Sequence, residues 1–115
     1  MKLIVAMIKP FKLQEVKDAL HDLRVTGMIY TEVRGIGNQK VHEAIYRGSD
    51  YLSDLVPKVK IEVAVPDHLA EAAMTGILTS ASTGKIGDGK VFVLALDEGA
   101  QLPTGGAASW QSNCL

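Results

Sequence analysis

Apolar residues are spaced along this chain in a pattern that occurs twice. Lys2 to Ile8 is an apolar run that ends just before Pro10, which is typical of a buried strand. After Gly27, the alternation from Met28 to Gly35 predicts another strand. Between the two, apolar positions recur at the spacing of one helix face: Leu13, Val16, Ala19, Leu20 and Leu23.

The second copy of the pattern is clearer than the first. Val59 to Val65 alternates so that every second residue is a Val or Ile, which predicts a strand with one buried face. Pro66 and Asp67 favour a helix start, with Asp67 as the capping side chain. Leu69, Ala73, Gly76 and Ile77 then follow at helical spacing, and Val91 to Leu96 predicts a last strand.

Two strand–helix–strand units, Lys2 to Gly35 and Val59 to Leu96, predict an α+β, ferredoxin-like βαββαβ fold. Its four antiparallel strands carry both helices on one face of the sheet. The other face is then bare and apolar, which predicts that the chain associates with copies of itself.

The segment between the two units, residues 36–56, has no sustained periodicity. Loops of this length inside compact domains are uncommon and are usually functional or disordered. Two interpretations remain open: a flexible hairpin extension without a role, or a loop that contacts a partner protein from a rigid scaffold.

Composition limits the classes of protein that need to be considered. The chain has 115 residues, of which 47% are hydrophobic and 22% charged, so one soluble domain is expected. A net charge of −1 argues against nucleic-acid or anionic-membrane partners, and no apolar run is long enough to cross a bilayer. The N-terminal stretch lacks a signal-peptide cleavage site and Cys114 is the single cysteine, so we expect a cytoplasmic protein.

A glycine- and lysine-rich segment, residues 84–90, is the strongest candidate for binding chemistry. It reads Gly-Lys-Ile-Gly-Asp-Gly-Lys and matches the Gly-x4-Gly-Lys spacing of a nucleotide-binding P-loop. However, Val91 and a strand follow, where that motif needs Ser or Thr and a helix. On composition alone two interpretations stay open: an anion-binding nest of backbone N–H groups, or a tight connection that needs glycine for its geometry.

The remaining reactive residues predict neither catalysis nor a metal site. His21, His42 and His68 lack metal-ligand spacing. Ser82 and Thr83 have no neighbouring base in the sequence. We therefore expect a protein that is not an enzyme.

Taken together, six runs in the chain resemble the nitrogen-regulatory PII signal proteins, without gaps from Met1 to about Leu96. These runs are Ile8 to Leu13, Thr26 to Met28, Thr31 to Gly35, Tyr46 to Gly48, Pro57 to Glu62 and Thr83 to Lys90. The resemblance implies a ferredoxin-like homotrimer that binds adenine nucleotides in clefts between subunits. It also implies that residues 36–56 are the T-loop, which docks on a transporter, enzyme or regulator.

The resemblance also assigns residues to sites. Around the nucleotide it places Gly27, Met28, Ile29, Gly35, Gly37, Glu62, Ala64, Gly87, Asp88, Gly89 and Lys90. For Mg²⁺ and a small anionic effector it implies Gln39, Lys40 and Lys58, with Lys58 pairing with 2-oxoglutarate. Tyr51 stands where some members are uridylylated.

The chain departs from the family pattern at positions that reach the nucleotide phosphates. Asn38, Gln101 and Pro103 stand where the family usually has arginine, and Ile29 replaces Thr or Ser near the adenine. The loss of these charge-assisted phosphate contacts predicts that ADP or AMP binds as well as ATP or better. It also leaves open whether Mg²⁺–ATP is held well enough to support binding of 2-oxoglutarate. This is similar to a carboxysome-associated branch that responds to bicarbonate. The alternatives are an ordinary nitrogen-regulatory protein that senses ATP, ADP and 2-oxoglutarate, and a weak ATPase.

We therefore divide the chain into a PII-like domain, residues 1–96, and a divergent C-terminal tail, residues 97–115. Pro103 and the glycines of the tail disfavour regular structure. Trp110 is either an anchor over the nucleotide cleft or part of a disordered tail that also carries Cys114.

Overall fold

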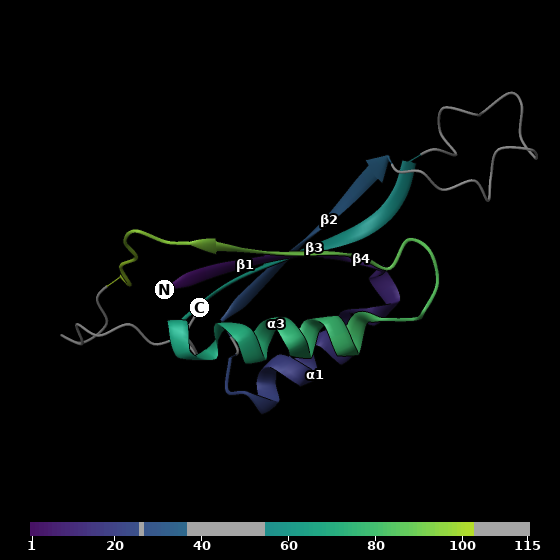
Figure 1. Cartoon of the computed structure of the whole chain (residues 1–115). Coiled ribbons are helices and arrows are strands. Elements are labelled where there is room, and N and C mark those ends of the chain that lie inside the picture. The colour runs from purple at the N-terminus through teal and green to yellow at the C-terminus, as the bar shows by residue number, and fades with distance from the viewer. Residues whose placement is uncertain (26, 37–54, 103–115) are drawn as a thin grey trace, which may run out of the picture.

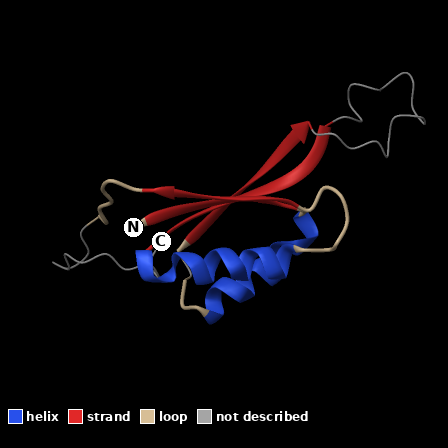
Figure 2. Ribbon diagram, viewed as in Figure 1, coloured by secondary structure: helices blue, strands red, loops and turns tan. Residues whose placement is uncertain are grey.

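The computed structural model describes residues 1–25, 27–36 and 55–102. Along the chain it contains β1 (Lys2–Ile8), the 3-10 turn η1 (Pro10–Lys12), α1 (Leu13–Asp22), β2 (Met28–Ile36), β3 (Leu55–Val65), α3 (Asp67–Ala81) and β4 (Gly89–Ala95). The strands form one antiparallel sheet in the order β2-β3-β1-β4, and both helices cover the same face (Figures 1 and 2). The predicted βαββαβ fold is confirmed.

The core lies between the sheet and the two helices, and strand alternation decides which side chains enter it. From Ile4 to the end of β1 and from Val59 to the end of β3, every second residue is fully or almost fully buried, as in Ile4 and Ile61, both at 0% exposure. Leu20 of α1 and Ile77 of α3 meet them from the helix side and are also fully buried. Residues facing the core therefore follow the two periodicities visible in the sequence, two for strands and 3.6 for helices.

Among the described residues, no helix or loop covers the opposite face of the sheet, which carries apolar side chains. Ile29 of β2 and both Phe92 and Leu94 of β4 are each 47% exposed there. Leu3 and Val5 of β1 share this face and are partly buried. An apolar face of this kind is the feature expected from the sequence, and exposed apolar surface commonly marks an interaction site.

The strands β2 and β3 continue beyond the rest of the sheet as a two-stranded ribbon, defined here as 33–36 and 55–58. Pairing of β3 with β1 ends at Val59 opposite Ile8, whereas pairing with β2 continues to Leu55 opposite Ile36. Figure 1 shows the ribbon projecting past the helices. The sequence predicted a strand only from Val59, because Pro57 disfavours a central strand. Pro57 is tolerated because the β1 side of the ribbon has no strand to pair with.

The predicted cap of the second helix is wrong. Pro66 occupies the N-cap position of α3, and Asp67 is the first helical residue without a capping hydrogen bond. Its carboxylate instead lies 2.8 Å from the amino group of Met1, which brings the start of β1 to the start of α3. This ion pair lowers the pKa of Asp67 by a hydrogen bond from the amine and by its charge. A negative charge in the first helical turn also interacts favourably with the helix dipole.

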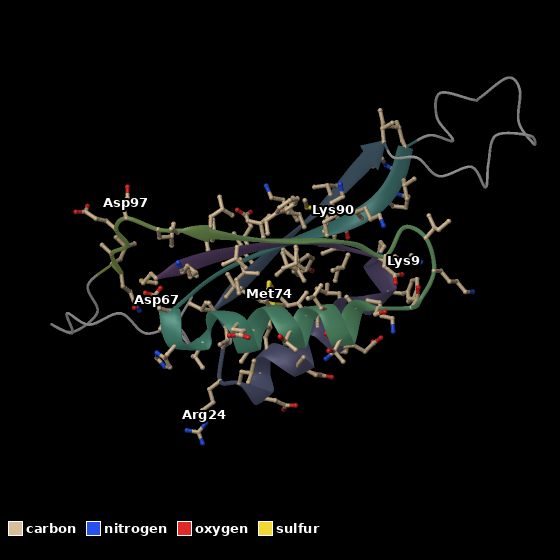
Figure 3. All side chains as sticks on the ribbon, in the orientation of Figure 1. Lys9, Arg24, Asp67, Met74, Lys90 and Asp97 are labelled. Carbon is tan, nitrogen blue, oxygen red and sulfur yellow. The ribbon has the colours of Figure 1, made fainter. Side chains whose placement is uncertain are left out.

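Helix α1 ends at a residue with strained backbone. Arg24 has φ of 61°, a left-handed conformation that favours glycine. The amides of Arg24 and Val25 donate to the carbonyls of His21 and Leu20, at 2.8 and 2.9 Å, which is the Schellman pattern. In Figure 3 the Arg24 side chain points away from the part of the protein that the structure describes.

We predict that Arg24→Gly stabilises the protein by about 0.5–1 kcal/mol, because relief of left-handed strain exceeds the entropy lost by glycine. Urea unfolding at fixed protein concentration measures the difference. Arg24→Ala is the matched control, since it removes the guanidinium but keeps Cβ. An equal gain in Arg24→Ala would show that charge, not backbone conformation, is responsible.

Candidate functional site

The candidate site is built around the connection between α3 and β4, residues 82–90, called here the Gly-Lys loop. Three of its glycines, Gly84, Gly87 and Gly89, have φ of 77°, 89° and 123°. At Gly89 a Cβ atom would lie 1.8 Å from the carbonyl oxygen of Met7, so no side chain fits. The loop therefore needs glycine both for its turns and for its close approach to β1.

The carboxylate of Asp88 organises the loop from inside. It accepts hydrogen bonds from the amides of Thr83 and Gly84, at 2.8 and 3.0 Å, and from the hydroxyl of Thr83. The ammonium of Lys9 lies 3.2 Å from the same carboxylate and donates to the Thr83 hydroxyl at 3.2 Å. The Thr83 hydroxyl, the Thr83 amide, Lys9 and the Gly84 amide hold the pKa of Asp88 well below its usual range.

These bonds add a structural role for Asp88. The resemblance places this residue around a nucleotide, which stays a prediction, and its carboxylate is engaged within the loop, whose shape it determines. Sequence reasoning missed Thr83 and Lys9 as partners. The sequence did contain a pattern that predicts this contact: a Thr and an Asp stand at the two ends of a glycine-containing turn. Such side chains commonly close turns by hydrogen bonds to the backbone.

Lys58 fastens the loop to the base of the ribbon. Its ammonium donates a hydrogen bond to the carbonyl oxygen of Gly87. Partial burial, followed by the charge of Lys9, lowers the pKa of Lys58, and Asp88 acts in the opposite direction. Lys58, expected to bind an effector, is thus part of the same cluster as the loop.

The Gly-Lys loop is strongly positive although the whole chain is slightly acidic. Lys85 and Lys90 belong to the loop, Lys9 and Lys58 contact it, and Asp88 is its one acidic residue. The formal charge of this group is therefore +3, against −1 for the chain. Such local charge beside glycine-rich backbone suits an anion.

Hydrogen bonds within the loop narrow the place where an anion would sit. The amides of Thr83 and Gly84 are taken by Asp88, and the amide of Lys85 donates to the Thr83 hydroxyl at 3.2 Å. The first part of the loop is therefore closed on itself. Backbone N–H donors for an anion must therefore come from the second part of the loop, from Ile86 to Lys90.

A second group of expected site residues lies at the other end of the sheet. Ile29 and Glu62 are cross-strand partners on the uncovered face, and Ala64 follows on the same face of β3. The side chain of Met28 is partly buried and packs against the core. Gly27 directly precedes β2.

The two groups are well separated within one chain. Glu62 and Lys58 are four residues apart on β3, which corresponds to about 13 Å at the rise of a strand. One chain thus presents two separate patches. Gly35, also expected near the nucleotide, lies in the ribbon opposite Val56, where an added Cβ would meet nothing within 4 Å.

Several expected site residues lie outside the described residues. These are Gly37, Gln39, Lys40 and Tyr51, together with Asn38, Pro103, Trp110 and Cys114. Gln101, which stands where the family usually has arginine, is described and half-buried after β4.

One surface depression lies at the base of the ribbon and another is lined by the Gly-Lys loop itself. One of about 440 Å³ lies beside Lys58, between Pro10 and the ribbon residues Arg34 and Pro57. The other, of about 160 Å³, lies between the end of α3 and the start of β4 next to Lys90. A larger hollow of about 760 Å³ runs between α1 and α3, but its walls are mainly small side chains such as Ala19, Ala72 and Gly76, remote from the loop.

In residues 1–25, 27–36 and 55–102 no group of three or more His, Cys, Asp or Glu side chains is placed to hold a metal ion. The helices in these ranges are also too short or too polar to cross a membrane.

We predict that Gly89→Ala destabilises the protein by at least about 3 kcal/mol, because Cβ collides with the β1 backbone in a conformation reserved for glycine. Gly84→Ala is the matched control: its φ is also positive, but nothing lies within 4 Å of the added Cβ. It should cost only about 1–2 kcal/mol of strain. Denaturant unfolding of both variants measures the difference, and equal losses would contradict the collision.

We predict that Asp88→Asn lowers the stability of the folded protein by an amount that depends on pH. Because the folded pKa of Asp88 lies below its ordinary value of 3.8, its contribution to stability is complete above that value and is lost as the pH falls toward the folded pKa. The variant should be less stable than the wild type at neutral pH, and the gap should narrow below about pH 4. Urea midpoints across this range test it. A gap that stays constant into acid would show that the carboxylate's charge is not involved.

Comparison with known proteins places these features in a family. The family model for "Nitrogen regulatory protein P-II" matches residues 1–105. The chain is 51% identical over 105 residues to the nitrogen regulatory protein P-II of Haemophilus influenzae, covering 91% of this chain and 94% of that protein. It has the same identity and coverage with the P-II protein of Rhodospirillum rubrum, and is 50% identical, with the same coverage, to nitrogen regulatory protein P-II 1 of Escherichia coli. A ferredoxin-like sheet with one bare face, a Gly-Lys loop and these identities show that the chain belongs to the nitrogen regulatory protein P-II family.

Proposed function

We propose that this protein is a nitrogen-regulatory signalling subunit that binds an adenine nucleotide with its phosphates at the Gly-Lys loop. The observation that carries the proposal is the local charge of +3 around a glycine-rich loop whose shape Asp88 fixes in advance. A loop that is already ordered loses little conformational entropy when it binds an anion. Family membership supplies the class of ligand.

The proposal includes a homotrimer with nucleotide clefts between subunits. Two features of the single chain support it. The uncovered sheet face exposes apolar side chains such as Phe92 and Leu94, and a second copy can bury them. The Ile29–Glu62 patch is separate from the Gly-Lys loop of the same chain, so a site made of both can form where one subunit meets the next.

Nitrogen regulation is favoured over a bicarbonate response. The relatives described above carry the name nitrogen regulatory protein P-II, and they cover nearly the whole chain. This supports the interpretation given above as the alternative, with 2-oxoglutarate as the anionic effector near Lys58. We propose that a bound effector changes how residues 36–56 dock on a partner protein in the cytoplasm.

A relative preference for ADP or AMP over ATP is a further part of the proposal. It follows from Asn38, Gln101 and Pro103, which replace arginines of the family pattern. Each missing guanidinium removes a charge-assisted phosphate contact, and the contacts removed are those to the outer phosphates.

A signalling role is favoured over nucleotide hydrolysis. A general base works best when its pKa lies near the operating pH. Asp88 is the carboxylate of the Gly-Lys loop, and its pKa is lowered by donors that already occupy it. It is therefore a poor base, and activation of water at this loop has no evident agent among the described residues.

Isothermal calorimetry with ATP, ADP and AMP, each with and without Mg²⁺, 2-oxoglutarate or bicarbonate, tests the proposal. We expect adenine nucleotides to bind, and Lys90→Ala to weaken them about tenfold or more, because a hydrogen bond to a charged group contributes about 1.5–3 kcal/mol. Lys17→Ala, which removes an exposed lysine on α1, is the control and should bind as the wild type does.

Absence of binding by all three nucleotides would overturn the proposed function. Enhancement by bicarbonate but not by 2-oxoglutarate would overturn the choice of effector alone. ATP bound much more tightly than both ADP and AMP would remove the expected preference, and steady phosphate release that stops in Lys90→Ala would favour the ATPase alternative.

A further inference from the structure

A groove of about 760 Å³ runs between α1 and α3 on the outer surface of the helix layer, and is called here the α1–α3 groove. Its floor is formed by Ala19 and Leu23 of α1 and by Gly76 of α3. A Cβ atom added at Gly76 would lie 3.9 and 3.8 Å from the side chains of the first two. Ala72 and Thr75 also line the groove and are exposed, so it is open to solvent.

The α1–α3 groove combines an apolar floor with hydrogen-bond acceptors. Asp22 and Glu71 contribute carboxylates to its lining, and Thr75 contributes a hydroxyl. A side chain that fills the groove should therefore be large and mainly apolar, with a donor for one of these acceptors. Tryptophan has this combination, because its ring buries about 150–250 Å² and its indole N–H finds an acceptor when buried.

A second copy of the chain is poorly suited to this groove. Assembly through the uncovered sheet face leaves the groove open, because the helices lie on the other face of the sheet (Figure 1). A two-fold contact of groove with groove would bring Asp22 and Glu71 of both copies together, and like charges at an interface are unfavourable.

The C-terminal segment of the same chain begins close to one end of the groove. The amide of Leu96, just after β4, donates to the carbonyl of Met1 at 3.1 Å. The amino group of Met1 in turn lies 2.8 Å from the carboxylate of Asp67 at the start of α3. His68, the next residue, lines the groove. The end of β4 and the start of α3 accordingly lie at the same end of the molecule in Figure 1.

This segment has the length and the composition that the groove requires. Residues 103–115 contain no Asp, Glu, Lys or Arg, and they include Trp110, the single tryptophan of the chain. Trp110 lies outside the described residues, eight positions after Leu102. Eight extended residues reach about 26–29 Å, whereas α3, with 15 residues, is about 22 Å long. Trp110 can therefore reach any part of the groove.

We propose that the segment 103–115 docks on the helices of its own subunit, with the ring of Trp110 in the α1–α3 groove. The ring packs on Ala19 and Gly76, and its N–H donates to one of the acceptors in the lining. Docking ties down a chain end that otherwise has nothing to hold it. Trp110 follows the residues 1–105 that the family model matches, and the inference does not depend on nucleotide binding.

The fluorescence of Trp110 in the full-length protein tests the inference. In the wild type we expect emission at a shorter wavelength than in the urea-unfolded chain, and severalfold weaker quenching by acrylamide. Ala72→Gln puts a long polar side chain in the groove at an exposed position, and glutamine is a good helix former. It should bring both values close to those of the unfolded chain. Lys17→Gln introduces the same side chain on α1 outside the groove and should behave as the wild type does.

Cross-linking identifies the chain that supplies the tryptophan, and it does not depend on Ala72→Gln being folded. Cys114 is the single cysteine and follows Trp110 by four positions. Thr79 is exposed and lines the groove. Under mild oxidation Thr79→Cys should form a disulfide with Cys114 within one chain, severalfold faster than Lys17→Cys does.

Four results would overturn the inference. The first is an exposed Trp110 in the wild type, and the second is emission that a folded Ala72→Gln leaves unchanged. The third is a disulfide that forms mainly between chains, which would assign the groove to a neighbouring copy, or that forms equally fast in Lys17→Cys. The fourth is a shift of the emission on addition of ADP that persists in Ala72→Gln, because it would place Trp110 at the nucleotide.

Discussion

The close approach of Gly89 to Met7 is the constraint on which the candidate site depends. Only a glycine lets β4 begin this near to β1, and this contact sets the register that pairs Gly89 with Ile8 and Lys90 with Met7. The same contact fixes where the preceding loop ends. Asp88 is thereby placed beside Lys9, the residue that follows β1, and its carboxylate can close the loop on Thr83. A backbone contact thus positions a polar cluster without any ligand.

One-sided coverage of the sheet has consequences beyond stability. The helices bury one face, and the other face carries Ile29, Glu62, Phe92 and Lys90. Apolar and charged residues therefore share a surface that the single chain leaves open. Covering the apolar ones with a second copy also brings charged groups of two chains together. The intersubunit site proposed above would follow from the same geometry that favours assembly.

The sequence was sufficient to predict the helices and strands, but it was not sufficient to predict the contacts of individual polar residues. Alternation from Val59 to Val65 has one interpretation, so the core strand was predicted. The ribbon was predicted on its β2 side, as part of the strand from Met28 to Gly35, but its β3 side was missed, because Pro57 hides a strand whose second edge is unpaired. Asp67 fits a capping pattern, but the amino group of Met1, distant in sequence, competes for its carboxylate. The strained backbone at Arg24 was not predicted either, because the left-handed conformation is usually adopted by glycine. Local patterns predict local structure, and these exceptions all arise from tertiary contacts or backbone geometry.

The charges around the Gly-Lys loop are the physical argument for an anion as the ligand of this cluster. A structural ion-pair cluster minimises its energy when opposite charges balance. Here two ammonium groups, those of Lys9 and Lys58, lie near the one carboxylate of Asp88. Burial, followed by the positive charge of Lys9, lowers the pKa of Lys58. Within this cluster of described residues the positive charges therefore outnumber the negative one. An anionic phosphate would compensate the excess, and this charge distribution would then favour its binding.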